Sequence, residues 1–91
     1  MTQSNPSIAI YPGTFDPITL GHENIAHRAT RIFDKIIVAV ASNASKKCFF
    51  SFEERVGLVK AVFSEHKAIE VIGFNGLLMD FVEAQNALHI L

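Results

Sequence analysis

The chain has 91 residues, of which 49% are apolar, and a net charge of −1. This length fits one small domain, and a near-neutral charge without a basic block gives a nucleic-acid partner no electrostatic support. No apolar run is long enough to span a bilayer, and residues 1–7 lack the basic-then-apolar pattern of a secretory signal. The single cysteine excludes an internal disulfide and fits a reducing compartment. These features predict a soluble cytoplasmic protein with neither a nucleic-acid nor a membrane partner.

The first half of the chain contains two predicted strands separated by a helix. Residues 8–11 form a short apolar run ended by Pro12-Gly13, which predicts a buried strand. Residues 22–33 predict a helix, because apolar side chains recur there at the spacing of one helix face: Ile25, Ala29, Ile32 and Phe33. Residues 35–41 are a continuous, largely β-branched run, typical of a strand covered on both faces.

The second half repeats this alternation. Ser51-Phe52-Glu53-Glu54 matches a capping box and predicts a helix start, with an inward face of Phe52, Val56, Val59 and Phe63. Residues 69–72 predict a third strand ended by Gly73. Residues 76–86 predict a third helix with Leu77, Leu78, Phe81 and Val82 inward, and residues 88–91 begin a fourth apolar strand.

The predicted order is therefore β-α-β-α-β-α-β, which favours an α/β fold with a doubly wound parallel sheet. A mixed α+β sheet is the alternative. In the common doubly wound order the first strand lies between the second and the fourth, and ligands bind at the crevice where the winding reverses. We interpret residues 1–91 as the N-terminal part of a single domain, cut after its fourth strand.

Residues 11–22 lead from the first strand into the first helix, where a doubly wound fold places its phosphate site. They lack the glycine-rich patterns GxGxxG and GxxxxGK[ST]. Gly13 lets the backbone approach a ligand, Thr14 offers a hydroxyl, and Gly21 opens a helix whose free N–H groups favour an anion. His22 either only caps this helix or faces the phosphate, and the Thr-x-Gly-His spacing favours the second interpretation.

Residues 11–22, Tyr-Pro-Gly-Thr-Phe-Asp-Pro-Ile-Thr-Leu-Gly-His, resemble the signature of phosphopantetheine adenylyltransferases. These enzymes belong to the nucleotidyltransferase superfamily, which is marked by (His/Thr)-x-Gly-His. Further matches are Arg28-Ala29-Thr30, Ser45-Lys46-Lys47 and Phe52-Glu53-Glu54-Arg55-Val56. The resemblance extends over residues 8–91, and it implies a Rossmann-like nucleotidyltransferase fold.

The resemblance also implies a reaction, the transfer of an adenylyl group from ATP to 4'-phosphopantetheine, which gives dephospho-coenzyme A and pyrophosphate. By similarity, His22 binds the ATP phosphates and stabilises the transition state. Thr14 would hydrogen-bond the phosphopantetheine phosphate, and the backbone at Thr14 and Phe15 would touch the nucleotide. Gly13, Asp16 and Gly21 would support this loop.

Lys46 matches the lysine that binds the substrate phosphate in this family, and we assign it a catalytic role beside His22. Lys47 is expected to be an ordinary solvated lysine. Leu78 belongs either to the core or also to the lining of the pantetheine arm. Asp16 is either a capping acceptor within the loop or a group near the metal-bound phosphates.

The other polar and aromatic candidates are expected to be structural. His27 and His66 are predicted on exposed helix surface, and His and Cys nowhere recur at metal-ligand spacing. Magnesium is therefore expected to bind mainly through the ATP phosphates rather than in a protein cage. Phe49, Phe50 and Phe52 are expected to pack the second helix rather than to stack bases.

The chain also departs from the family pattern. Members are longer, and beyond the position of Leu91 they carry an Arg-Gly-x-Arg segment, an acidic adenylate contact and a Ser-rich motif. Leu20 replaces a polar residue that many relatives carry. We therefore expect the parent protein to be the enzyme and the 91-residue piece alone to be weakly active or inactive.

Two other functions remain open. The first is another small-molecule nucleotidyltransferase, with a cytidylyl donor or a nicotinamide mononucleotide acceptor. The second is a truncated, non-catalytic module that binds phosphopantetheine or coenzyme A, or that serves in assembly. Full-length relatives form hexamers, and the apolar content is compatible with a homo-oligomer.

Overall fold

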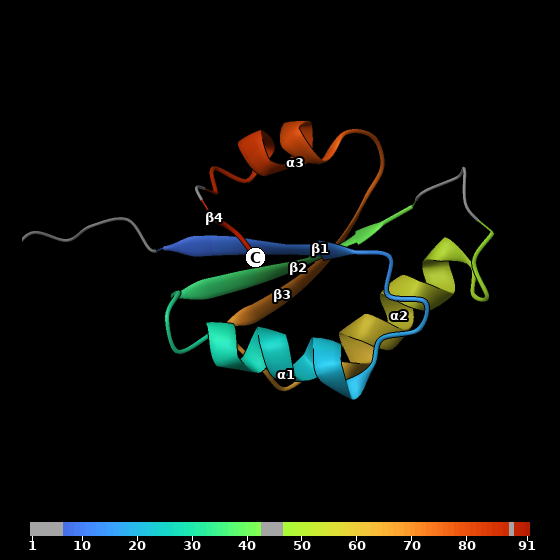
Figure 1. Cartoon of the computed structure of the whole chain (residues 1–91), viewed down its shortest axis with the longest axis horizontal. Helices are drawn as coiled ribbons and strands as arrows, with labels where there is room; N and C mark the ends of the chain where they lie inside the picture. Colours follow the sequence, from blue (N-terminus) through green and yellow to red (C-terminus); the bar gives the residue numbers. More distant parts are fainter. Residues whose placement is uncertain (1–6, 43–46, 88) are drawn as a thin grey trace, which may run out of the picture.

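The computed structural model describes residues 7–42, 47–87 and 89–91. Strands and helices alternate along these residues as predicted (Figure 1). The elements are β1 (Ile8–Gly13), α1 (Leu20–Ala29), β2 (Lys35–Ala41), α2 (Phe52–Val62), β3 (Ile69–Phe74), α3 (Leu78–Ala84) and β4 (His89–Ile90).

The four strands form one parallel sheet with the order β3-β2-β1-β4. Helices α1 and α2 cover one face of this sheet, and α3 covers the other (Figure 1). The winding therefore reverses between β1 and β4, and the doubly wound α/β prediction is confirmed. The mixed α+β alternative is wrong, since every strand pair is parallel.

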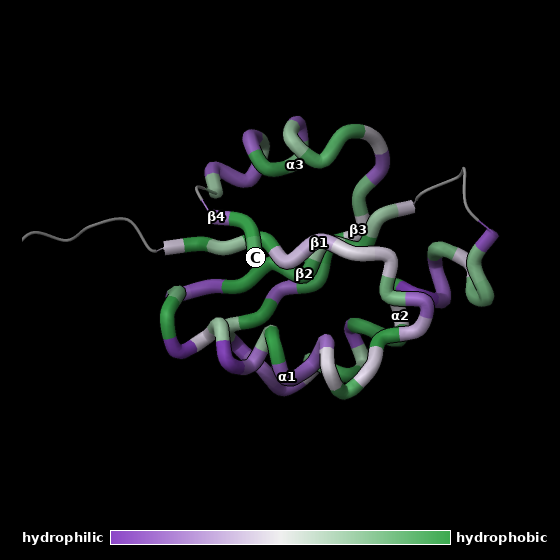
Figure 2. The backbone as a smooth tube through the Cα atoms, in the orientation of Figure 1, coloured by the Kyte–Doolittle hydropathy of each residue, from purple (hydrophilic) through white to green (hydrophobic). Residues whose placement is uncertain are grey.

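The core consists of two apolar layers separated by the sheet. Alternate residues of β2 point to opposite faces, so that Ile36, Val38 and Val40 pack under α1 and α2. Ile37 and Ala39 pack under α3. Figure 2 shows the hydrophobic residues gathered in the strands, whereas the helices mix hydrophobic and hydrophilic positions. This pattern explains why β2 could be predicted to the residue from its apolar run.

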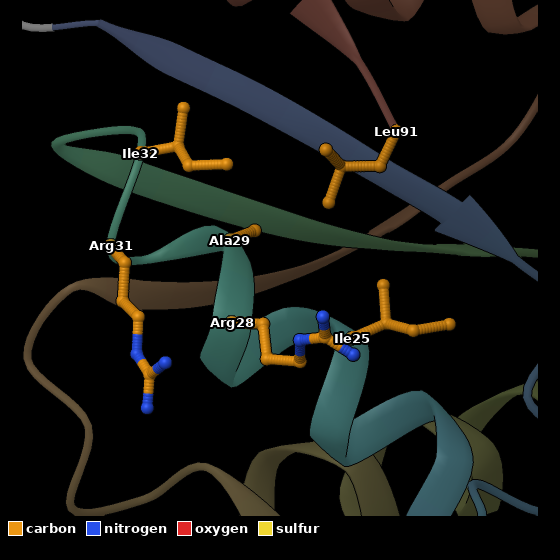
Figure 3. Close-up of a pocket in the computed structure, with 6 residues that line it drawn as sticks. All are labelled: Ile25, Arg28, Ala29, Arg31, Ile32 and Leu91. Carbon is orange, nitrogen blue, oxygen red and sulfur yellow. The ribbon is translucent and has the colours of Figure 1, made fainter.

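The predicted apolar face of the first helix is wrong in part. Ile25 is 49% exposed and Ile32 is 76% exposed, while Ala26 and Ala29 are buried. The small alanine side chains let the helix lie close to the sheet, and the larger isoleucine side chains lie outside this contact and remain exposed. Ile25, Ile32 and Leu91 instead line an open groove of about 410 Å³, shown in Figure 3 with its neighbours Arg28, Ala29 and Arg31.

Several helices and strands also begin or end at residues other than those predicted. Helix α1 stops at Ala29, and residues 30–33 form a turn in which the N–H groups of Ile32 and Phe33 both donate to the carbonyl of Ala29. Strand β1 continues through Pro12-Gly13. Helix α3 is shorter than predicted, and Leu77, its N-cap, is 72% exposed instead of inward. No helix in the described part of the chain has the length and apolarity needed to cross a membrane.

Gly73 does not end the third strand. It pairs with Val40 inside the sheet, and β3 continues to Phe74. A methyl group at Gly73 would lie 2.5 Å from Cζ of Phe52 and 3.1 Å from Cγ2 of Val56. The glycine is therefore needed because α2 packs directly on this point of the sheet.

His27 and His66 are not exposed helix residues as predicted. Both side chains are half-buried, and their ring centroids lie 4.2 Å apart. His66 lies in the turn after α2, and the ring of Phe63 packs 5.8 Å from that of His27. The two histidines thus form part of the contact between α1 and the end of α2.

Two glycine variants test this packing. We expect Gly73→Ala to lower the free energy of unfolding by about 1–3 kcal/mol, because the added methyl overlaps Phe52. Gly57→Ala in α2 is the matched control, since nothing lies within 4 Å of the added carbon. There we expect a gain of about 0.5–1 kcal/mol from helix propensity. Urea denaturation measures both, and equal effects would contradict the packing described here.

Candidate functional site

The candidate site begins where β1 ends. Gly13 pairs with Val40 of β2, so the loop of residues 14–19 leaves the sheet beside the carboxyl end of β2. The loop then enters α1, whose first turn brings free N–H groups to the same edge. The sheet register therefore places the predicted phosphate loop at the edge where doubly wound folds bind ligands.

The loop is built around Phe15, which is only 3% exposed. Its backbone adopts a left-handed conformation, with φ of 52°, and its ring packs edge-on against Tyr11 at 5.4 Å. A Cβ at Gly13 would lie 2.9 Å from this ring. Gly13 is thus required by the loop's own packing, and its predicted approach to a ligand stays a prediction. Burial also raises the pKa of the Tyr11 phenol.

His22 closes the first turn of α1 through a capping box. The backbone N–H of Thr19 donates to Nδ1 of His22 at 3.0 Å, and the N–H of His22 donates to the Thr19 hydroxyl at 3.3 Å. Here an imidazole takes the place of the usual Glu or Gln at the third helical position. The predicted capping role of His22 is therefore present in the structure.

The cap also determines which ring nitrogen of His22 can donate a hydrogen bond to a ligand. Because a backbone N–H can only donate, Nδ1 acts as an acceptor, and the proton of the neutral ring lies on Nε2. The ring packs edge-on against Phe15 at 4.9 Å between centroids. His22 is thus held from two sides and keeps one N–H donor that the cap does not use. Capping the helix and facing a phosphate are compatible roles for this residue.

Asp16 acts as an acceptor for backbone groups, which was one of its two predicted roles. Its two carboxylate oxygens accept the N–H groups of Phe49 and Phe50 at 2.6 and 2.9 Å. The loop after β1 is thereby attached to the segment that precedes α2. Both oxygens are engaged, which disfavours a direct role for Asp16 beside metal-bound phosphates.

Sequence reasoning did not select Arg55, although it connects more of the site than any predicted residue. It is 2% exposed, and its guanidinium donates to four backbone carbonyls, those of Thr14, Ala41, Ser42 and Phe50. A signal was present, because Arg55 lies three residues after Phe52 and four before Val59, on the inward side of α2. An arginine at such a position is ordinarily assumed to reach solvent.

The structure brings most of the predicted site residues to one edge of the sheet. Thr14 and Phe15 follow β1, and Gly21 and His22 lie in the first turn of α1. Leu78 begins α3 on the opposite face, half-buried against the layer that contains Ile10 and Ile37. This position is compatible with either of its predicted roles. Lys46 and Ser45 fall outside the described residues, and Lys47 is exposed, as predicted.

Metal ligands and surface grooves give no further support to a site at His22 among the described residues. Within the described ranges, no group of three or more His, Cys, Asp or Glu residues could hold a metal ion. His22 lines neither the groove beside Ile25 and Leu91 nor a second groove beside Phe52 and Lys60. The phosphate site stays a prediction that rests on the loop, the helix start and His22.

With this geometry in place, comparison with known proteins identifies the class. The chain belongs to the cytidylyltransferase-like family, whose model matches residues 10–91. Within that class, its relatives include the phosphopantetheine adenylyltransferases of Lawsonia intracellularis and Clostridium botulinum (strain Eklund 17B), which are 50% and 54% identical over 91 and 84 residues. These alignments cover 100% and 92% of the chain and 53% of each relative. The resemblance found in the sequence is confirmed, and the chain spans about half the length of these curated relatives.

Solved structures support the same fold. A NadR protein in complex with NAD and AMP-PNP matches with a TM-score of 0.75 at 20% identity, over 93% of this chain and 29% of that protein. The nicotinic acid mononucleotide adenylyltransferase of Plasmodium falciparum complexed with NaAD matches with a TM-score of 0.70 at 20% identity, over 90% and 46%. At this identity the likeness establishes the fold alone.

The cap at His22 gives a direct test. We expect His22→Ala to lower the free energy of unfolding by about 0.5–2 kcal/mol, because the Thr19 N–H loses its acceptor. His22→Gln should retain most of the stability, since a Gln amide oxygen at this position can accept the same N–H. Thermal and urea denaturation compare the two, and equal losses would show that the imidazole does not serve as the cap.

Proposed function

We propose that this chain forms the phosphate-handling half of a phosphopantetheine adenylyltransferase, an enzyme of coenzyme A biosynthesis. The observation that carries the proposal is the 50–54% identity to enzymes of that name over nearly the whole chain. The site supports it, because the capping residue His22 lies in the first turn of α1, where the helix dipole and free N–H groups favour an anion.

In the proposed reaction, a phosphate oxygen of 4'-phosphopantetheine attacks the α-phosphorus of ATP. A new phosphorus–oxygen bond forms, the bond to the β-phosphate breaks, and pyrophosphate leaves with the electron pair. The products are dephospho-coenzyme A and pyrophosphate. No protein nucleophile is required, so the protein contributes by positioning the reactants and stabilising charge on the phosphoryl oxygens.

Each site residue has a role in this proposal. The Nε2–H of His22 donates to the ATP phosphates and stabilises charge that develops in the transition state. Thr14 binds the phosphopantetheine phosphate through its hydroxyl, and the backbone at Phe15 lies along the nucleotide. Lys46 supplies a cation to the substrate phosphate, and Leu78 lines the pantetheine arm.

Magnesium enters the proposal with ATP. The described residues offer no metal cluster, and Asp16 uses both oxygens on backbone N–H groups. These residues therefore do not fit a protein-held metal site, and we propose that magnesium binds mainly to ATP phosphate oxygens. The chain itself stabilises the phosphate charge in this proposal through Lys46 and through the N–H donors of His22 and of the helix start.

Because the chain spans about half the length of its curated relatives, we propose that efficient turnover needs the other half as well. The cytoplasmic location and the homohexamer remain proposals of the same kind, as does the binding of the products dephospho-coenzyme A and coenzyme A. A non-catalytic module that binds phosphopantetheine is the alternative.

Calorimetry and turnover assays separate these functions. We expect the 91-residue chain to bind 4'-phosphopantetheine and to form little dephospho-coenzyme A from it and ATP. The same chain fused to the second half of the Lawsonia intracellularis relative should form the product readily. Near-normal turnover by the chain alone would contradict the need for the other half. Preference for CTP, or for nicotinamide mononucleotide as acceptor, would contradict the substrate assignment.

His22→Gln tests the proposed chemistry in the active fusion. Since the Gln side chain can keep the cap but lacks the imidazole N–H, we expect kcat to fall by about 100- to 1,000-fold with little change in stability. The exposed residue His89 provides a control, and His89→Gln should leave kcat within about twofold, as for a surface substitution. Unchanged kcat in His22→Gln would remove His22 from the mechanism.

A further inference from the structure

Arg55 is a buried cation that donates its hydrogen bonds to neutral backbone carbonyls. Four of its five N–H donors are used: Nη1 donates to the carbonyls of Thr14 and Ala41, both at 2.8 Å, and Nε and Nη2 donate to those of Phe50 and Ser42 at 3.2 Å. The Phe52 ring lies 5.7 Å from the guanidinium carbon. Among the residues that the structure describes, no carboxylate forms an ion pair with it.

These four carbonyls belong to three segments that are distant in the sequence. The first segment follows β1, the second is the end of β2, and the third precedes α2, so a single side chain joins three of the segments that meet at this edge of the sheet. In Figure 1 the loop after β1 passes beside α2, the helix that carries Arg55. The chain on either side of residues 43–46 is held at Ala41–Ser42 and at Phe50.

Asp16, in the loop after β1, also binds the segment that precedes α2. Its carboxylate accepts the N–H groups of Phe49 and Phe50, while Arg55 donates to the carbonyl of Phe50. The Phe50 peptide backbone is therefore bound through its N–H to the β1 loop and through its carbonyl to α2. Asp16 and Arg55 together form what we call the Asp16–Arg55 clamp.

Stability alone does not account for such an arrangement. Taking a guanidinium out of water carries a desolvation cost that neutral carbonyls offset only in part, and a well-packed apolar side chain often stabilises a core as well or better. What a planar guanidinium adds is direction, because its N–H groups form a rigid fork with fixed angles. The clamp therefore defines the relative positions of the three segments.

We propose that the Asp16–Arg55 clamp positions the phosphate loop for substrate, so that Asp16 and Arg55 are positioning residues for the phosphoryl-transfer site. The proposal rests on the proposed function in one respect, namely that the loop of Thr14 and His22 binds phosphate. Arg55 acts through Thr14 and through the chain that flanks residues 43–46. It does not act by touching the phosphate, since it is 2% exposed and four of its donors are already engaged.

Asp16→Asn tests the clamp without changing the size of the side chain. The Asn side chain keeps one acceptor oxygen and turns an NH₂ group toward a backbone N–H, so one of the two contacts is lost. Removing a negative charge near the site should by itself favour an anion, so weaker binding would have to come from lost positioning. We expect calorimetry of the 91-residue chain to show 4'-phosphopantetheine binding weakened about tenfold or more.

Asp34→Asn is the matched control for charge and chemistry. Asp34 also accepts a backbone N–H from a distant residue, that of Ser7 at 2.8 Å, but at the opposite end of the sheet. It uses only Oδ2 for this contact, and an Asn oxygen can replace it. We expect unchanged affinity in this variant. Equal affinities of Asp16→Asn and wild type, or equal losses in the two Asn variants, would overturn the proposal.

Arg55→Lys tests the other side of the clamp while keeping the charge. A lysine ammonium cannot reproduce the fork, so we expect affinity to fall about tenfold or more, whereas Arg31→Lys on the exposed surface should have no effect. Hydrogen exchange monitored by NMR gives a readout that does not depend on ligand. If the clamp acts as a unit, the amides of Phe49 and Phe50 should exchange at least about tenfold faster in Arg55→Lys, although Arg55 does not touch either N–H.

The proposed function and the role of the Asp16–Arg55 clamp can be contradicted by different results. If the wild-type chain binds neither 4'-phosphopantetheine nor ATP, the proposed function fails, and the clamp is then judged on hydrogen exchange alone. Unchanged exchange at Phe49 and Phe50 in Arg55→Lys would overturn the clamp even if substrate binds. If Arg55→Lys does not fold, Asp16→Asn with its Asp34→Asn control decides the question.

Discussion

The parallel pairing of β1 with β2 is the constraint on which the rest of the structure depends. Its register runs from Ile8 opposite Lys35 to Gly13 opposite Val40, so both strands end at the same edge of the sheet. The loop after β1 and the end of β2 are thereby brought close enough for one arginine to bind carbonyls of both. The first turn of α1, the capping residue His22 and the clamp all depend on this shared edge, because the segments that carry or contact them leave the sheet there.

Much of this arrangement could be predicted from the sequence, because the signals were local. The uninterrupted run of residues 35–41 identifies a strand buried on both faces, and Ser51 with Glu54 identifies the start of α2, where both capping-box bonds are present. The alternation of strands and helices gave the topology. The Tyr11–His22 loop was placed correctly because its position after the first strand is a consequence of that topology.

What the sequence did not predict depends on contacts between distant residues. Periodicity favours large side chains for a buried face, yet α1 buries Ala26 and Ala29 and leaves Ile25 and Ile32 at its side, because a close approach to the sheet needs small residues. Gly73 looked like a strand end, since nothing in its own neighbourhood reveals that Phe52 packs against it. Arg55 was missed for the same reason, because its four partners come from three separate segments.

His22 uses Nδ1 for the helix cap and leaves Nε2 for a ligand, so a change at one nitrogen can be detected at the other. Nδ1 accepts the Thr19 N–H, and in the proposed function Nε2 donates to the ligand, so the two hydrogen bonds would be coupled through the same aromatic ring. An anion that accepts from Nε2 makes Nδ1 a better acceptor and shortens the bond to the Thr19 amide. If an anion binds at His22 as proposed, the amide resonance of Thr19 should therefore shift on binding, which gives a measurement that requires no label on the ligand and no turnover.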